Sequence, residues 1–566
     1  MIKLFSSEVS GLNMDKKIKT LMVASESDKI AKIGGLADVV YSLSRELVNK
    51  GTDVAVIIPY YGAIDKKEES SDNIVFFKNF SNSFGGKEWK IKLYYKTVDN
   101  VRFYLVQNDF FFGGEYGKVY IDSEKLKNGP FEDDSKRFAF FSKVVLDLLN
   151  EDKDFKDFNV IHCHDWHTST LILNLKLNKR YKGISKKKKV LYTIHNLDYQ
   201  GLRPFHDQNK SGLYSTFKTW FPDLYEDIKN DKEVLDKILD KKTKTPCVNL
   251  MRCAINYADV VNTVSPTYMY EIMKPDDKKR NFIGGRNLEK DLIDVFNRGA
   301  LYGVLNGCDY KTHDPNLLDP PYNRTIYNWQ DIKSAGKIKF IKNFKKIVEE
   351  TIDDKNENPD LKNYQVIKKK LKNLKDTDLW LDKPLILSVT RVVDQKVKIL
   401  LEDYEDETVI DKILKKDIVF FVIGNGNLEE KLEFINKYDN CFYFRAFNKK
   451  LADRLYSVCD LFLMPSDFEP CGISQMIAMA YGTIPIVNKI GGLNDTVSDM
   501  INGFAYGGTN RESAKFNLVT LIDKILYLYK NKEFWRDMQN NALSTRFEWS
   551  KSADKYINLY DRTLNS

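Results

Sequence analysis

Polar side chains that could do chemistry gather just after an apolar segment near residue 160. His162, His164, Asp165 and His167 lie within six residues, around the end of the apolar run 160–163. Alternation along a strand would point His162 and His164 to one side, but His167 lies past the strand, so a shared metal is not assured. A substrate site is favoured over a metal site or a structural cluster, because α/β proteins place functional residues at the carboxyl ends of strands. Asp165 and His167 are expected to face that site.

Another histidine stands in the same position after the next apolar run. His195 and Asn196 directly follow residues 190–194. A lone histidine is most often a satisfied structural group. At the carboxyl end of a strand in an α/β sheet, a ligand contact becomes an equally good interpretation.

Two cations follow the apolar run 385–390. Arg391 offers a planar fork of donors and Lys396 a compact charge, and the two together suit a diphosphate. Such residues are common on loops, so the pair alone is a weak signal. The turn Gly424-Asn425-Gly426 is weaker still, because it lacks the full dinucleotide fingerprint.

The segment from Glu469 to Ile473 follows the apolar run 461–464. A helix is predicted to start near Gly472 and to offer free N–H groups and a partial positive charge to a phosphate. Glu469 could accept hydrogen bonds from sugar hydroxyls. The helix start is expected to lower the pKa of Cys471. Since no histidine lies nearby in sequence, packing or substrate contact is favoured for Cys471 over a nucleophilic role.

One motif occurs twice, once near each end of the chain. The pattern K-I-G-G-L-x-D-x-V stands at 32–40 and again at 489–497. In each copy a Gly-Gly turn, which can bring main-chain N–H groups close to an anion, runs into an apolar segment with an Asp. The repeat indicates two similar half-molecules facing one cleft.

Length and composition favour a multidomain globular protein. The chain has 566 residues, of which 43% are hydrophobic and 30% charged, and its net charge is +8. The lysine runs 186–189 and 368–370 lack interleaved aromatic residues, so they are interpreted as solvated faces and no nucleic-acid partner is expected. The 7 cysteines are scattered without a C-x-x-C pair, which indicates a reducing compartment.

No membrane partner is expected. No run reaches the roughly 18 to 20 apolar residues that a membrane span needs. The first 17 residues lack the apolar core of a secretory signal. The cytoplasm is therefore the default location, and a plastid stays open if a transit peptide has been removed.

The elements that must position these residues alternate between apolar strands and amphipathic helices. The apolar run 20–24 leads through the first Gly-Gly turn into a helical pattern that ends at Gly51, and 54–58 follows as a second strand. This βαβ unit builds a parallel sheet covered by helices on both faces. Further strands of this half are predicted at 160–163, 190–194 and 260–264.

The second half restarts the same pattern. Strands are predicted at 385–390, 419–424, 461–464 and 484–487, and prolines between about 305 and 325 mark the junction of the halves. Two polar stretches stand apart from the pattern. Residues 206–245 are expected to form a surface excursion, and 330–380 to form helices with a polar loop near 353–360.

Ten motifs in a fixed order resemble those of bacterial glycogen synthases and plant starch synthases, which form glycosyltransferase family 5. The resemblance extends from about residue 19 to 560. The motifs are K-I-G-G-L-A-D-V at 32–39, D-D-S-K-R-F-A-F-F-S at 133–142, H-C-H-D-W-H at 162–167, T-I-H-N-L-D-Y-Q-G at 193–201, Y-A-D-V-V-N-T-V-S-P-T-Y at 257–268, L-N-G-C-D-Y at 305–310, T-R-V-V-D-Q-K at 390–396, P-S-D-F-E-P-C-G-I-S-Q at 465–475, Y-G-T-I-P-I-V at 481–487 and K-I-G-G-L-N-D-T-V at 489–497.

The resemblance implies an α/β GT-B fold, with two Rossmann-like domains facing a deep interdomain cleft. The implied organisation is a short N-terminal extension at 1–18, an acceptor-side domain at 19–310, a donor-side domain at 311–545 and a final segment at 546–566. The donor-side domain would carry the inserted helical segment 330–380. The final segment would cross back to the N-terminal domain as a helix.

The implied activity is retaining, metal-independent transfer of glucose to a growing glucan. The donor would be ADP-glucose, with UDP-glucose as the alternative. The acceptor would be the 4-hydroxyl at the non-reducing end of an α-1,4-glucan, either glycogen or starch. No cofactor and no metal site are implied beyond the nucleotide-sugar substrate, and the oligomeric state is left open.

The resemblance also assigns roles to residues. His195 would sit over the reacting glucose, Arg391 and Lys396 would hold the diphosphate, and Glu469 would orient the sugar. Acceptor-side contacts would come from Asp165, His167 and Asn196. The donor pocket would comprise Lys32, Gly34, Gly35, Asp38, Asn306, Phe447, Cys471, Gly472, Ile473, Gly491, Gly492 and Thr496. Closure between the two Gly-Gly turns would be the catalytic motion.

The physical logic agrees with these roles. Departure of a nucleoside diphosphate builds negative charge on the β-phosphate, where fixed positive groups are most effective. Retention normally suggests a carboxylate nucleophile. Since the sequence identifies none, front-face attack by the acceptor within an ion-pair-like state is the preferred hypothesis.

Departures from the family pattern and two rival interpretations remain. Val397 stands where the family usually has Gly, and Phe447 where it often has a Tyr that stacks on the base. Residues 108–112 also fit the pattern poorly, as do both polar stretches.

One rival is a sucrose or trehalose-phosphate synthase, disfavoured by Ile477, where many of those enzymes carry a second acidic residue. The other is a non-catalytic glucan-binding scaffold, which the intact candidate site residues disfavour.

Overall fold

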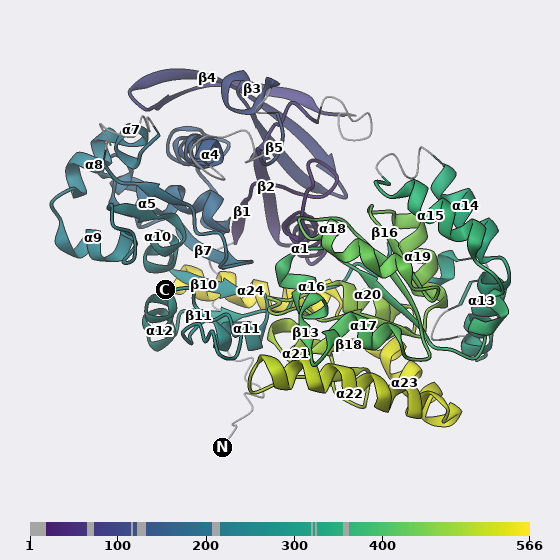
Figure 1. Cartoon of the computed structure of the whole chain (residues 1–566). Helices are drawn as coiled ribbons and strands as arrows, with labels where there is room; N and C mark the ends of the chain where they lie inside the picture. Colours follow the sequence, from purple (N-terminus) through teal and green to yellow (C-terminus); the bar gives the residue numbers. More distant parts are fainter. Residues whose placement is uncertain are drawn as a thin grey trace. The chain divides into compact units, whose positions relative to one another are not determined.

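The computed structural model describes residues 18–64, 73–114, 117–121, 132–206, 215–318, 321–322, 325, 327–354 and 361–566. Residues 1–17 of the expected N-terminal extension lie outside this set. The chain forms two compact units (Figure 1). Unit 1 comprises Met1–Val261 and Ala553–Ser566, and unit 2 comprises Asn262–Ser552. The domain bounds 19–310 and 311–545 stay a prediction.

The larger sheet has the strand order β11-β10-β7-β6-β1-β2-β5-β4-β3. The chain passes into unit 2 within β10, so β1 to β7 belong to unit 1 and β11 belongs to unit 2. Parallel pairing joins β7, β6, β1, β2 and β5, whereas β4 and β3 add antiparallel strands at one edge (Figure 1). The strands are β1 (Lys19–Val23), β2 (Asp53–Pro59), β3 (Val75–Phe84), β4 (Lys87–Val98), β5 (Val101–Gln107), β6 (Val160–His164), β7 (Lys189–Ile194), β10 (Val260–Thr263) and β11 (Leu301–Gly303). A separate antiparallel pair consists of β8 (Leu202–Pro204) and β9 (Cys247–Asn249).

Helices cover the parallel strands of unit 1, which is why those strands are almost entirely buried and mainly apolar. α1 packs on β2, and α5 packs on both α4 and α10. The final helix, α24, contributes its residues from Ala553 onward to this unit. The helices of the unit are α1 (Gly35–Asn49), α3 (Asp109–Phe112), α4 (Glu132–Glu151), α5 (Ser169–Leu177), α6 (Lys182–Ser185), α7 (Phe217–Trp220), α8 (Pro222–Ile228), α9 (Lys232–Ile238), α10 (Leu250–Tyr257) and α24 (Trp549–Asn565).

Unit 2 repeats this design with a sheet of order β16-β15-β12-β17-β18-β19, all of whose neighbouring strands pair in parallel. Buried apolar side chains form separate clusters that include alternating residues of the same strands. The strands are β12 (Leu385–Val389), β15 (Val419–Ile423), β16 (Cys441–Phe444), β17 (Leu461–Met464), β18 (Ile484–Asn488) and β19 (Phe504–Tyr506), with a small hairpin of β13 (Asp403–Tyr404) and β14 (Glu407–Thr408).

The helices of unit 2 include the long pair α22 and α23, which run along one side of the unit in Figure 1. Those before the sheet are α11 (Pro266–Glu271), α12 (Glu289–Asn297), α13 (Trp329–Lys342), α14 (Phe344–Asp353) and α15 (Tyr364–Asn373). Those that follow are α16 (Asp394–Leu401), α17 (Val409–Leu414), α18 (Glu429–Leu432), α19 (Lys449–Val458), α20 (Ser474–Ala480), α21 (Gly491–Thr496), α22 (Arg511–Tyr529) and α23 (Lys532–Ser544).

Each sheet contains a switch point, which is the place where the direction of strand addition reverses. In unit 1 the chain goes from β1 outward to β2 and later returns to place β6 on the other side of β1. In unit 2 it goes from β12 to β15 and later places β17 on the other side of β12. Ligands of open α/β sheets bind outside the carboxyl ends of the strands at such a point.

The strands predicted from apolar runs are confirmed in both units, with bounds within one residue of the predicted ones. The helices expected in 330–380 are confirmed as α13, α14 and α15, while part of the predicted polar loop, 355–360, lies outside the described residues. The described part of 206–245 is more than a surface excursion. Phe217 and Trp220 of α7 and Leu224 of α8 are buried, and they anchor the segment to the unit.

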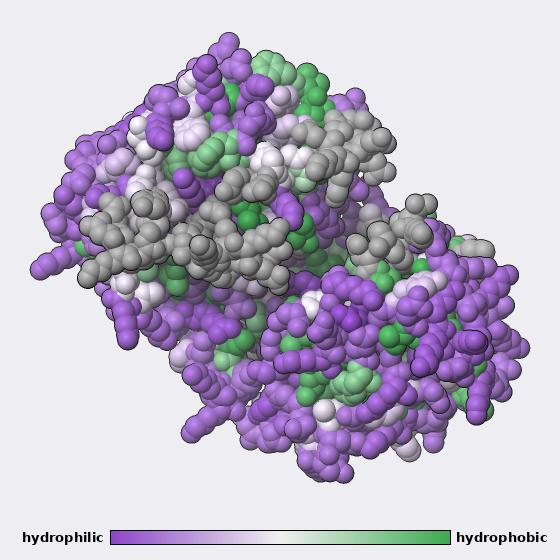
Figure 2. All heavy atoms as spheres, turned by 45° about the horizontal axis from the view of Figure 1, so that its top comes forward, coloured by the Kyte–Doolittle hydropathy of each residue, from purple (hydrophilic) through white to green (hydrophobic). Residues whose placement is uncertain are grey.

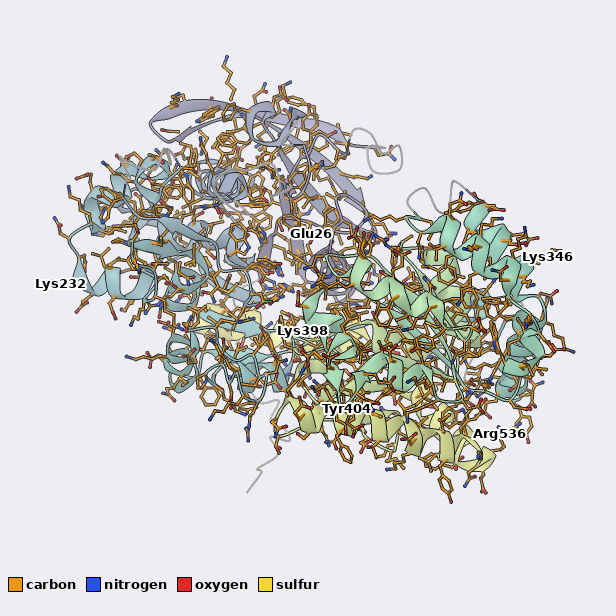
Figure 3. The ribbon with its side chains drawn as sticks, in the orientation of Figure 1. Glu26, Lys232, Lys346, Lys398, Tyr404 and Arg536 are labelled. Atoms are coloured by element: carbon orange, nitrogen blue, oxygen red, sulfur yellow. The ribbon has the colours of Figure 1, made fainter. Side chains whose placement is uncertain are left out.

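The surface shown in Figure 2 is largely hydrophilic, with hydrophobic side chains scattered among charged ones. Lys346 on α14, whose side chain is 75% exposed, is one of the charged residues at the surface of unit 2 (Figure 3). No helix in the described part of the chain is long and apolar enough to cross a membrane.

Candidate active site

The carboxyl ends of β6 and β7 bring Asp165 and His195 together at the switch point of unit 1. Asp165 Oδ1 accepts a hydrogen bond from the main-chain N–H of His195 at 2.7 Å. Asp165 has φ 54°, a left-handed conformation that costs a non-glycine residue energy and is held here by its surroundings. Burial raises the pKa of Asp165 to about 7, although hydrogen bonds from the N–H groups of His195 and Asn196 lower it. The Asp165 carboxylate therefore fixes the loop that carries His195.

The candidate histidines, His167 and His195, differ in burial but are both uncharged. His195 is half-buried, and burial lowers the pKa of its imidazole to about 3. His167 is buried among aromatic rings, with its ring centroid 4.2 Å from that of Trp166 and 4.7 Å from that of Phe138. Burial also lowers the pKa of His167 to about 3. Asn196 is half-buried and accepts the N–H of Asp198 at 2.9 Å.

The histidine cluster does not form a metal centre in the described residues. Both ring nitrogens of His162 are hydrogen-bonded, Nδ1 to the hydroxyl of Tyr560 at 3.0 Å and Nε2 to the hydroxyl of Thr193 at 2.8 Å. No group of three or more His, Cys, Asp or Glu side chains among the described residues is arranged to hold a metal ion.

The first Gly-Gly turn wraps around a buried carboxylate of its own unit. Glu26 lies between β1 and α1 (Figure 3), and its Oε2 accepts the N–H groups of Ile33 at 2.6 Å and Gly34 at 3.0 Å. Burial raises the pKa of Glu26. Lys32 is exposed and pairs with Asp38, one helical turn into α1, and its Nζ lies 3.8 Å from Asp28.

Tyr120 joins this turn to the neighbourhood of His167. Its hydroxyl donates to Glu26 Oε1 at 3.2 Å and lies 3.1 Å from the hydroxyl of Ser25. Its ring centroid is 5.5 Å from that of His167. Glu26, Asp165 and His195 thus stand beyond the carboxyl ends of three adjacent strands, β1, β6 and β7.

The switch point of unit 2 joins a cation to a carboxylate. Lys396, in the first turn of α16, forms an ion pair with Glu469 on the loop after β17, and the Ser466 hydroxyl donates to Glu469 Oε2 at 3.1 Å. Gln395 fastens the two loops together, because its side chain donates to the Phe468 carbonyl at 2.9 Å. Arg391 is exposed at the end of β12.

The loop after Glu469 leads into α20, which begins at Ser474, two residues later than predicted. The prediction of a lowered pKa for Cys471 is wrong. Burial raises the pKa of the Cys471 thiol to about 12, and the nearby negative charge of Glu469 acts in the same direction. The thiol is therefore protonated and packs in an apolar cluster with Cys308 and Met476.

The second Gly-Gly turn contacts the Glu469 loop directly. Gly491 has φ 41°, and a Cβ added there would lie 2.0 Å from the carbonyl oxygen of Glu469. The N–H of Gly492 donates to the same carbonyl at 3.0 Å. On its other side, the Gly491 N–H donates to both carboxylate oxygens of Glu271 at 3.0 and 3.1 Å.

Asp495 of the second repeat differs in its partners from Asp38 of the first. It accepts the N–H of Thr267 at 2.8 Å and the hydroxyl of Thr267 at 2.7 Å, and so caps α11. Thr496 is buried, donates to the Gly492 carbonyl at 2.8 Å and accepts the side chain of Gln475 at 3.1 Å.

Two other predicted donor residues have contrasting environments. Asn306 is buried, and its Oδ1 has no hydrogen-bond partner within the described residues. Phe447 follows β16 and is 68% exposed, which leaves its ring free to stack on a flat ligand.

Glu26, Glu271 and Tyr120 were missed by sequence reasoning. Glu26 lies three residues past β1, so the rule that favoured Asp165 and His195 could have found it. Glu271 and Tyr120 offer no such signal, because their partners lie far away in sequence. The Gly491 N–H that Glu271 accepts is 220 residues from it.

Two family models match the chain, one in each half. The model described as "Starch synthase catalytic domain" matches residues 19–294, and "Glycosyl transferases group 1" matches residues 369–545.

Curated relatives are similar along nearly the whole chain. A glycogen synthase of Clostridioides difficile (strain 630) is 34% identical over 556 residues, covering 96% of this chain and 99% of the relative. A glycogen synthase of Desulforamulus reducens is 33% identical over 560 residues, covering 97% and 99%.

Solved structures share the fold. The catalytic domain of starch synthase IV from Arabidopsis thaliana, bound to ADP and acarbose, superposes with a TM-score of 0.73 at 26% identity, covering 97% of this chain and 100% of that one. A sucrose-phosphate synthase from Thermosynechococcus elongatus has a TM-score of 0.53 at 14% identity, which shows a likeness of fold alone.

Proposed function

Since the chain belongs to the glycogen and starch synthase family, has its GT-B fold and is a glucan-elongating glucosyltransferase, we propose that its donor is ADP-glucose and that it transfers glucose with retention. The acceptor is the 4-hydroxyl at the non-reducing end of an α-1,4-glucan. The ADP bound to the similar starch synthase supports an adenine nucleotide over UDP-glucose.

The observation that carries the proposal is the contact of Glu469 with both Lys396 and Ser466 at the switch point of unit 2. The Lys396 ammonium is held next to a carboxylate that can accept hydrogen bonds from glucose hydroxyls. Arg391, on the loop between β12 and α16, supplies a second cation. These fixed charges stabilise the negative charge that develops on the departing diphosphate. In this proposal Arg391 and Lys396 do the work that a metal ion does elsewhere, and no cofactor takes part.

The remaining donor residues have supporting roles in the proposal. Exposed Phe447 stacks on the base, and exposed Lys32 approaches the nucleotide sugar. Gly472 and Ile473, just before α20, face the phosphates. Gly491 and Gly492 hold the Glu469 loop in place, as their contacts with the carbonyl oxygens of this loop support.

Retention proceeds by front-face attack. The two carboxylates best placed to act as nucleophiles are already engaged, Glu469 with Lys396 and Asp165 with the main-chain N–H of His195. The acceptor hydroxyl therefore attacks from the face that the diphosphate leaves, and Asp165 and Asn196 help to place the sugars. Mass spectrometry of the protein trapped with a slow donor tests this step, since a glucosyl adduct on either carboxylate would refute it.

A donor assay tests the proposed function. The protein is incubated with glycogen primer and either ADP-[14C]glucose or UDP-[14C]glucose, and label in precipitated glucan is counted. We expect incorporation from ADP-glucose, release of the label as maltose by β-amylase, and much slower incorporation from UDP-glucose. Faster transfer from UDP-glucose would reverse the donor assignment, and no incorporation from either donor would end the proposal.

A further inference from the structure

His164 and His195 are joined ring to ring. Nδ1 of His164 lies 3.0 Å from Nε2 of His195. Burial lowers the pKa of His195 to about 3 and that of His164 well below its usual value, so both rings are neutral. A neutral imidazole has one N–H and one bare nitrogen, so this hydrogen bond allows only two arrangements of the protons.

The other nitrogen of His164 decides between them. His164 Nε2 is buried and has no hydrogen-bond partner within the described residues. If His195 were the donor, the single proton of His164 would sit on Nε2 as a buried, unpaired N–H. If His164 donates from Nδ1, Nε2 is only a bare acceptor. Unpaired buried N–H groups are the rarer of the two in folded proteins, so the second arrangement is favoured.

This arrangement fixes which nitrogen of His195 carries its proton. With Nε2 accepting from His164, the proton of His195 is on Nδ1. No described residue pairs with this Nδ1–H, and the side chain is half-buried rather than enclosed. His195 therefore presents one donor, in a known place, at the switch point of unit 1.

His164 is itself held by the last helix of the chain. Its ring centroid is 4.1 Å from that of His162. His162 has both nitrogens engaged, one of them by the hydroxyl of Tyr560 on α24. A continuous array of contacting side chains therefore runs inside unit 1 from Tyr560 through His162 and His164 to His195. The ring of His164 has little freedom to turn within it.

We propose that His164 is a positioning residue that holds His195 as the Nδ1–H tautomer, so that His195 donates this hydrogen bond to a hydroxyl of the donor glucose. The inference rests on the proposed function for the role of His195. The tautomer itself is a property of the protein without substrate and can be tested separately.

Nitrogen NMR of the full-length protein labelled with [15N]histidine tests the tautomer. The chain has 6 histidines, so single substitutions assign each ring. We expect His195 to show a protonated Nδ1 and a bare Nε2, and His164 to show the same pattern. A proton on Nε2 of His195 would overturn the proposal. The nitrogen signals report the tautomer even if neither nucleotide sugar is a substrate. Failure of the tautomer proposal can therefore be distinguished from failure of the proposed function.

Two substitutions at the same position test the consequence. His164→Asn keeps an amide N–H close to the place of Nδ1, whereas His164→Leu has none. We expect the leucine variant to lose roughly 10- to 100-fold in kcat, the range for residues that orient an active-site group, with an unchanged KM for glucan. The asparagine variant should recover most of this loss. Equal losses in both variants, or full activity of the leucine variant, would contradict the proposal.

His206→Asn is the matched control. His206 is an exposed histidine of the same unit that bonds to the Tyr225 hydroxyl at 2.7 Å. Its substitution should change neither kcat nor the nitrogen signals of His195. If His164→Leu does not fold, the nitrogen spectrum of the unsubstituted protein still shows which nitrogen of His195 carries the proton.

Discussion

The carboxylate of Glu271 accepts the main-chain N–H of Gly491 with both of its oxygens, at 3.0 and 3.1 Å. The first repeat has its own version of this contact, in which Glu26 accepts the N–H groups of Ile33 and Gly34. Each Gly-Gly turn was predicted to bring N–H groups near an anion. In both copies these N–H groups meet a carboxylate of the same unit, so a ligand contact of the turns has to use other groups or displace that carboxylate.

The first prediction concerns pH and Glu271. Burial raises the pKa of Glu271 from 4.5 to about 7, so the folded state holds this proton more tightly than the unfolded chain. The stabilisation of the folded state by this bound proton is therefore complete below about pH 4.5 and is lost as the pH rises through about 7. Glu271→Gln stays neutral throughout. From pH 5 to pH 8, the free energy of unfolding of the unsubstituted protein should fall by about 1 to 2 kcal/mol relative to that of this variant, after allowance for partial solvent screening. Thermal unfolding measures this change.

The exposed Glu430 supplies the control for this experiment. Its side chain is 87% exposed, and Glu430→Gln removes the same charge without a buried hydrogen bond. We expect its stability to follow that of the unsubstituted protein across the pH range. A constant difference between Glu271→Gln and the unsubstituted protein from pH 5 to pH 8 would show that Glu271 does not take up a proton on folding.

The second prediction concerns the close approach of Gly491 to the Glu469 loop. Gly491→Ala introduces a Cβ 2.0 Å from the Glu469 carbonyl oxygen, at φ 41°, so the loop has to move. We expect destabilisation of ~1 to 3 kcal/mol and a fall in kcat of at least about 10-fold, measured by thermal unfolding and the donor assay. Full activity of this variant would mean that the loop position is not critical.

Gly336→Ala is the control for backbone substitution in the same unit. Gly336 lies inside α13, and a Cβ added there meets nothing within 4 Å. Alanine is the better helix former, so this variant should be more stable by up to about 1 kcal/mol, with unchanged kcat.

Most parallel strands of both units could be predicted, because helices bury both of their faces and their sequences are therefore mainly apolar, whereas the parallel strands β5, β16 and β19 were missed. The antiparallel edge of unit 1 gave no such signal. β3 leaves its apolar start, Val75, Phe76 and Phe77, exposed, has an irregular register beside Lys78 and continues in mainly polar residues, so its sequence shows no clean alternation. A strand of this kind is specified by its pairing with β4, not by its own residues.

The residues of the candidate site could be predicted where they come just after a strand in the sequence. Asp165, His195, Lys396 and Glu469 all stand just past a buried strand, and the sheet topology brings them to two switch points. Contacts between distant segments could not be predicted in this way. The engagement of Glu271 with Gly491 and the burial that raises the pKa of Cys471 depend on packing that no local pattern encodes.

The third prediction concerns Phe447 and the nucleotide base. Phe447→Ala removes an exposed ring, so stability should not change. Loss of one stacking contact should raise the KM for ADP-glucose by about 3- to 10-fold with little change in kcat. Phe516→Ala on α22 removes a ring that is 52% exposed elsewhere in unit 2 and should leave the KM unchanged. An unchanged KM in the Phe447 variant would remove this residue from the donor pocket.

The fourth prediction concerns Lys396 and the departing diphosphate. Lys396→Ala should lower kcat by about 100-fold or more, because one fixed positive charge next to the developing negative charge is lost. Glu469, which pairs with Lys396, would then be a buried carboxylate without its cation, so thermal unfolding has to be measured beside kcat. Lys398→Ala, two residues along α16 at an exposed position, removes the same charge from the protein and should keep full activity (Figure 3). If both variants keep their turnover, Lys396 does not stabilise the leaving group, and Arg391 becomes the residue to test.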